Sequence, residues 1–128
     1  MKYLYTGWLP SFGTDTARYR SLVSLGQDVV VLSFTPDTRR LGSKVAALEG
    51  RLGAGLGIWM YNLRLLAVAR QERPDVVWVD KGHLVMASTL RAIKRRTGAF
   101  LVCYNTDDIE YAGNGWRLHL KCLPEYDC

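Results

Sequence analysis

The chain has 128 residues, a length that fits one domain, residues 1–128. Apolar residues make up 48% and charged residues 23% of it, which excludes disorder as the state of any long segment. The formal net charge of +5 indicates an anionic partner only weakly, because nucleic-acid binders carry a dense basic stripe with interleaved aromatic residues and this chain has none. We therefore expect no nucleic-acid partner.

Targeting signals and cysteine usage favour a cytoplasmic protein. The longest apolar stretch, residues 55–69, is interrupted by polar residues and is too short to span a bilayer, so we interpret it as a buried helix. The N-terminal segment has too short an apolar run for a signal peptide. Cys103, Cys122 and Cys128 match no zinc or redox spacing, which favours a reducing compartment and predicts no metal site.

The first third of the chain predicts a strand, a helix and a second strand. Residues 2–6 form a short apolar run typical of a strand. After a loop, Thr14 or Asp15 is placed to cap the next helix with its side-chain oxygen, and Gly26 is expected to end that helix. Residues 28–34 are a continuous β-branched run, which is typical of a central strand covered on both faces.

The middle of the chain repeats this alternation. Residues 35–53 are polar, basic and glycine-rich and support no prediction of an element. A helix is predicted over residues 56–71, followed by a buried strand within residues 74–82. The apolar spacing that follows predicts another helix, which Gly98 ends, and residues 99–105 form the fourth strand.

Strands and helices at these spacings imply right-handed parallel crossovers. They predict an α/β fold, a Rossmann-like doubly wound and mainly parallel sheet of about four or five strands in an order near 2-1-3-4. Residues 116–123 predict a short helix, and residues 126–128 look like the beginning of a fifth strand. We therefore expect a truncated fold, and a free sheet edge of this kind would favour a homodimer.

In open parallel sheets, ligands bind beyond the carboxyl ends of the strands. This rule selects the segments 7–14, 33–38, 80–83 and 105–110. The first precedes a helix N-terminus, where backbone amides favour an anion. It matches neither the dinucleotide fingerprint nor the phosphate loop, which argues against an NAD enzyme or a nucleoside triphosphatase.

Two of these segments carry the polar groups that are best suited to binding or catalysis. Asp80 and Lys81 either satisfy each other at a strand end, or Lys81 or His83 meets a hydroxyl or phosphate group of a substrate. Asp107 and Asp108 belong to the densest acidic group of the chain. Neighbouring carboxylates at the rim of a cleft can accept protons from sugar hydroxyls, and they can equally serve as turn or cap residues.

A basic cluster lies near the end of the helix that Gly98 terminates. It consists of Arg91, Lys94, Arg95 and Arg96. Such a cluster complements the negative end of the helix dipole as a solvated face. The alternative is peripheral contact with an anionic membrane surface or a phosphorylated acceptor.

Three segments together, residues 13–34, 73–85 and 95–108, resemble the N-terminal domain of a GT-B-type bacterial glycosyltransferase of the group 1-like kind, which includes spore-maturation proteins. The resemblance implies a two-domain enzyme that transfers a sugar from a nucleotide-sugar donor to a carbohydrate or glycosylated acceptor. In such enzymes the N-terminal domain binds the acceptor, and catalysis occurs between the domains without a metal or other cofactor. The donor-binding domain is absent from this chain, so the donor would reach it only through that second domain.

By this analogy, the resemblance assigns Asp107 and Asp108 to catalysis. It assigns acceptor binding to Gly13, Thr14, Arg18, Asp80, Lys81 and Asn105. Two other functions remain open from the residues alone. One is a non-catalytic α/β binding or interaction module that self-associates, and the other is a flavodoxin-like domain that binds a free nucleotide.

Overall fold

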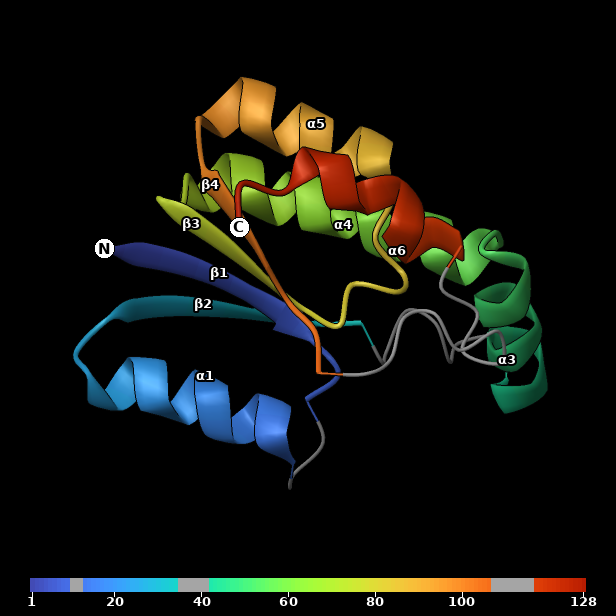
Figure 1. The fold of residues 1–128 in the computed structure, drawn as a ribbon, viewed down its shortest axis with the longest axis horizontal. Coiled ribbons are helices and arrows are strands. Elements are labelled where there is room, and N and C mark those ends of the chain that lie inside the picture. The colour runs from blue at the N-terminus through green and yellow to red at the C-terminus, as the bar shows by residue number, and fades with distance from the viewer. Residues whose placement is uncertain (10–12, 35–41, 107–116) are drawn as a thin grey trace.

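The computed structural model describes residues 1–9, 13–34, 42–106 and 117–128 (Figure 1). Its elements in chain order are β1 (Lys2–Gly7), α1 (Thr14–Ser24), β2 (Asp28–Ser33), α3 (Ser43–Leu52), α4 (Leu56–Glu72), β3 (Val76–Asp80), α5 (Ala87–Thr97), β4 (Phe100–Tyr104), α6 (Arg117–Cys122) and the 3-10 turn η2 (Leu123–Glu125).

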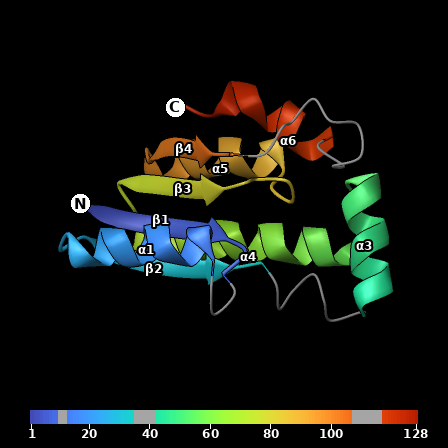
Figure 2. The ribbon, with the colours of Figure 1, turned by 60° about the horizontal axis from the view of Figure 1, so that its bottom comes forward.

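The strands form one parallel sheet in the order β2-β1-β3-β4. Helix α1 covers one face, and α4, α5 and α6 cover the other (Figures 1 and 2). The chain crosses from β1 to β2 in one direction and from β2 to β3 in the other, so right-handed connections place the two crossover helices on opposite faces. The Rossmann-like α/β fold and the strand order predicted from the sequence are confirmed.

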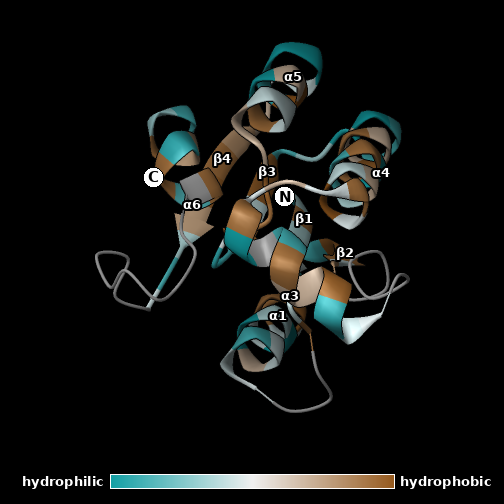
Figure 3. Cartoon of the chain, turned by 90° about the vertical axis from the view of Figure 1, so that its right-hand side faces the viewer, coloured by the Kyte–Doolittle hydropathy of each residue, from teal (hydrophilic) through white to brown (hydrophobic). Residues whose placement is uncertain are grey.

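The main core lies between the sheet and the helices α4 and α5. Along each strand, alternate side chains point into this layer, as the two-residue period of a strand requires. Its members from the strands include Leu4, Val77, Val79 and Leu101, and those from the helices include Ile58, Leu65, Leu90 and Ile93. In Figure 3, β3 and β4 are mainly hydrophobic, whereas the outer surface of α5 is largely hydrophilic.

Strand β2 lies at an edge of the sheet and pairs, within the described residues, with β1 alone. The expectation of a central strand covered on both faces was wrong, since Val31 is 38% exposed. A β-branched run fits any pleated, half-buried strand, so composition does not separate an edge strand from a central one.

Helix α1 begins without the predicted side-chain cap. Gly13 is the N-cap residue, and neither Thr14 nor Asp15 makes a capping hydrogen bond. The Asp15 carboxylate instead accepts a hydrogen bond from Arg18 Nη2 at 3.2 Å, so it is engaged one turn further along the helix. The predicted end of the helix is confirmed, because Gly26 follows it with φ 73°.

Helix α3 falls within the segment for which no element was predicted, and residues 35–41 lie outside the described residues. A single buried carboxylate ties α3 to α4. Both oxygens of Glu49 accept the backbone N–H of Gly57, at 3.2 and 3.1 Å, in the first turn of α4. A carboxylate at this position satisfies a free amide and interacts favourably with the helix dipole.

The last residues of the chain lie beside β4. Asp127 N donates to Leu101 O at 2.8 Å, and Cys103 N donates to Cys128 O at 2.8 Å. The segment predicted to begin a fifth strand therefore pairs with the expected edge of the sheet, although it forms no regular strand. The carboxylate of Asp127 also accepts the Leu101 N–H and pairs with Lys94, which together lower its pKa.

Helix α6 places His119 in the interior, at 1% exposure, and burial lowers the pKa of its imidazole from 6.5. As the pH falls through 6.5, the unfolded chain binds a proton that the folded chain does not. The free energy of unfolding should therefore fall between about pH 7 and pH 5.5. Urea denaturation at several pH values measures this slope. In His119→Gln the slope should largely disappear, and an unchanged slope in that variant would assign it to other groups.

Candidate functional site

Asp80, the last residue of β3, forms the centre of a polar cluster at the carboxyl edge of the sheet. Arg18 of α1 binds its carboxylate with two parallel hydrogen bonds, from Nε to Oδ2 at 2.7 Å and from Nη2 to Oδ1 at 2.9 Å. The Asp80 side chain has no exposed surface, and that of Arg18 is 21% exposed. The hydrogen bond to Asp80 raises the pKa of Arg18, so the guanidinium keeps its positive charge.

Tyr5 of the neighbouring strand β1 is the third member of the cluster. Its hydroxyl donates to Asp80 Oδ2 and lies 3.0 Å from the carbonyl oxygen of Asp15. Burial, together with the neighbouring carboxylate, raises the pKa of Tyr5, so the phenol remains protonated. The strand β1 and the helix α1 are therefore joined through one buried carboxylate of β3.

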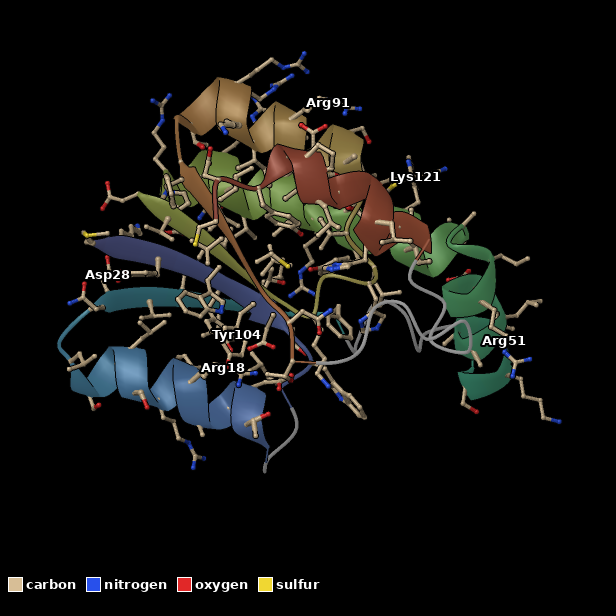
Figure 4. The ribbon with its side chains drawn as sticks, in the orientation of Figure 1. Arg18, Asp28, Arg51, Arg91, Tyr104 and Lys121 are labelled. Carbon is tan, nitrogen blue, oxygen red and sulfur yellow. The ribbon has the colours of Figure 1, made fainter. Side chains whose placement is uncertain are left out.

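An aromatic row crosses the α1 face of the sheet. Tyr5 stacks on Trp78 with ring centroids 6.2 Å apart, and Trp78 stacks on Tyr104 of β4 at 6.0 Å. The guanidinium of Arg18 lies 4.3 Å from the centre of the Tyr104 ring, within the range of a cation–π interaction (Figure 4). We call these three stacked residues, Tyr5, Trp78 and Tyr104, the aromatic floor.

A cavity of about 430 Å³ opens beside α1, and Trp78 is the member of the aromatic row that lines it. Its lining consists of Thr14, Ala17, Arg18, Ser21, Leu22, Leu25 and Trp78. Among the described residues, no group accepts a hydrogen bond from the buried indole Nε1–H of Trp78. A buried donor of this kind normally has a partner, and this one belongs to a residue that lines the cavity.

The turn after β3 has an unusual backbone. Lys81 adopts φ 66° and Gly82 adopts φ 64°, two successive left-handed residues. The Lys81 N–H donates to Tyr104 O at 2.8 Å, which links the carboxyl ends of β3 and β4. Left-handed conformations cost about 1 kcal/mol or more for a residue other than glycine and often occur at functional sites.

The structure brings together part of the set that the sequence predicted. Thr14 and Arg18 line the cavity, and Asp80 reaches it only through Arg18. Gly13 is exposed at the start of α1, whereas Lys81 and Asn105 are partly buried beyond the ends of β3 and β4. The predicted catalytic residues, Asp107 and Asp108, lie outside the described residues.

Sequence reasoning missed the aromatic floor, namely Tyr5, Trp78 and Tyr104. Aromatic residues in strands look like ordinary core residues, and nothing local distinguishes them. The parallel register gives the missing signal, since Tyr5 pairs with Trp78 and Asp80 pairs with Tyr104. An aligned β1, β3 and β4 would have placed these side chains on one face.

The basic cluster on α5 separates into two parts. Arg91 and Lys94 form ion pairs with Glu125 and Asp127, so their charges are matched within the fold. Arg95 and Arg96 are exposed and form no ion pair within the described residues. Figure 4 shows Arg91 on the outer side of the helix layer.

Two properties of the described part of the chain bear on cofactors and membranes. No three His, Cys, Asp or Glu side chains in it gather closely enough to hold a metal ion. No helix in it has both the length and the apolar character needed to cross a bilayer.

The fold places this chain in the class of Rossmann-like α/β domains. Comparisons with protein-family models, with curated proteins and with solved structures find no match to it.

Proposed function

We propose that this chain is the acceptor-binding domain of a glycosyltransferase that uses a nucleotide-sugar donor. The observation that supports the proposal is the cavity beside α1, which is lined by the aromatic ring of Trp78, a residue whose indole N–H has no partner among the described residues. A sugar presents C–H groups that pack on an aromatic face and hydroxyl oxygens that accept hydrogen bonds. An apolar pocket with a few fixed polar groups suits this chemistry.

Within this proposal, each residue of the site has a distinct task. Arg18 donates to acceptor oxygens with the part of its guanidinium that Asp80 leaves exposed, and Thr14 adds a hydroxyl. Asp80 is a positioning residue, because it holds Arg18 in place and has no exposed surface of its own. Asp107 or Asp108 would accept the proton of the reacting hydroxyl, and Lys81 and Asn105 would bind the acceptor.

The test uses the chain itself, titrated with a panel of methyl glycosides and disaccharides and followed by NMR shifts of the indole N–H groups. Binding at the cavity should shift the Trp78 signal. Trp78→Phe keeps an aromatic floor but removes the donor, and it should weaken binding by up to about tenfold, the value of one neutral hydrogen bond. The matched control is Trp59→Phe, because Trp59 is 53% exposed on α4 and lies outside the cavity.

If no glycoside binds, or if both tryptophan variants behave alike, the carbohydrate site is contradicted. A second function then gains support, a binding module that self-associates through the α1 face of the sheet. The observation favouring it is that large apolar side chains are exposed, namely Phe100 at 50% and Tyr104 at 38% on β4 and Leu25 at 72% at the end of α1. A concentration-independent dimer in light scattering would identify this alternative.

A further inference from the structure

A second cleft lies among the helices on the opposite face of the sheet from the cavity beside α1 (Figure 1). It is formed where the C-terminal ends of α4 and α5 meet, just before the strands β3 and β4 begin. Its volume is about 550 Å³, and its lining consists of Ala67, Arg70, Gln71, Arg73 and Arg96. Three of these residues are arginines, which come from two different helices.

The charges of this cleft are unbalanced. Within the described residues, no carboxylate forms an ion pair with Arg70, Arg73 or Arg96. The nearest acid in sequence, Glu72, is engaged by Lys2 Nζ at 2.7 Å. None of the three arginines therefore neutralises an acidic side chain within the described part of the chain.

The helix dipoles account for only part of this charge. Each helix C-terminus carries roughly −0.5 elementary charge, so the ends of α4 and α5 offset about one of the three positive charges. An excess of about two positive charges remains in a concave site. Mutual repulsion makes such a cluster unfavourable unless an anion enters it.

Arginine, in contrast to lysine, presents a planar fork of donors that matches the oxygens of a phosphate group in pairs. Gln71 adds an amide that can donate to the same ligand. A cleft that offers three such side chains suits an anion with two or more negative charges and several oxygens.

We propose that Arg70, Arg73 and Arg96 form a binding site for a phosphate or pyrophosphate group. The site is independent of the function proposed above, because it lies at the amino ends of the strands. The group is carried either by a soluble phosphate ester or by the headgroup of an anionic phospholipid. In the second case the cleft, and not the whole basic face of α5, makes the contact with the membrane surface.

The experiment compares two probes, inorganic pyrophosphate in calorimetry and vesicles of phosphatidylglycerol with phosphatidylcholine in a sedimentation assay. Both are used at about 0.15 M salt, where exposed charges are screened beyond about 8 Å. The test variants are Arg70→Gln and Arg96→Gln. Arg73 is left unchanged because its φ of 46° would add a backbone effect to any substitution.

The matched control is Arg95→Gln, which removes the same charge from the same turn of α5 but does not line the cleft. Arg70→Gln and Arg96→Gln should each weaken binding about tenfold, and Arg95→Gln should change it less than twofold. This pattern with pyrophosphate identifies a soluble ligand, and the same pattern with vesicles alone identifies a lipid headgroup. Absence of binding to both probes, or equal losses in Arg95→Gln and Arg96→Gln, overturns the site.

Discussion

Replacing Arg18 by methionine should lower the free energy of unfolding by about 3–5 kcal/mol. The reason is the environment of its partner, because the Asp80 side chain has no exposed surface and would remain as a buried carboxylate without a counter-charge. The hydroxyl of Tyr5 would then be its nearest remaining donor. The variant also loses the contact of the guanidinium with the Tyr104 ring, a smaller contribution.

Urea denaturation followed by tryptophan fluorescence and circular dichroism measures this loss. The double variant Arg18→Met with Asp80→Asn should lose less than the sum of the two single variants, since it removes the unpaired charge as well. Arg91→Met is the matched control, because it breaks an ion pair with Glu125 in which the arginine is 52% exposed. That change should cost less than about 1 kcal/mol. Equal losses in Arg18→Met and Arg91→Met would contradict a structural role for the buried pair.

The sheet could be predicted from the sequence because each strand is a local signal. Runs of β-branched and aromatic residues, such as 28–34 and 74–82, alternate with amphipathic segments of helical length, and the handedness of the crossovers then limits the strand order. The helix α3 was not predicted from the sequence. One buried carboxylate, that of Glu49, ties it to the first turn of α4, and no local sequence pattern predicts such a contact.

The candidate site, like the fold, could be predicted only in part. Asp80 was chosen from the sequence because it lies at the carboxyl end of a strand, which is a topological rule, whereas Arg18 was chosen through the resemblance to glycosyltransferases. Their pairing joins residues that are 62 positions apart, and it leaves the Asp80 side chain with no exposed surface for contact with a ligand. The aromatic floor was missed because strand register, which is not a property of one segment, aligns Tyr5 with Trp78.

The turn after β3 should be sensitive to substitution at Gly82. Gly82→Ala is expected to lower the free energy of unfolding by about 1–3 kcal/mol more than Gly98→Ala does. Both glycines are left-handed, with φ 64° and 73°, so each substitution carries the same backbone cost of about 1–2 kcal/mol. They differ in what a new methyl group would meet.

At Gly98 an added Cβ has no heavy atom within 4 Å, whereas at Gly82 it would lie 3.1 Å from His119 Nδ1 and 3.1 Å from the Tyr126 hydroxyl. His119 is buried and cannot easily move away, so the clash must displace α6 or the turn itself. Because Lys81 precedes this glycine, such a displacement would also disturb the carboxyl edge of the sheet. Equal losses at Gly82 and Gly98, measured by urea denaturation, would mean that α6 packs loosely enough to absorb the methyl group. A larger loss at Gly82 would show that the candidate site and α6 are held in place by the same close contact.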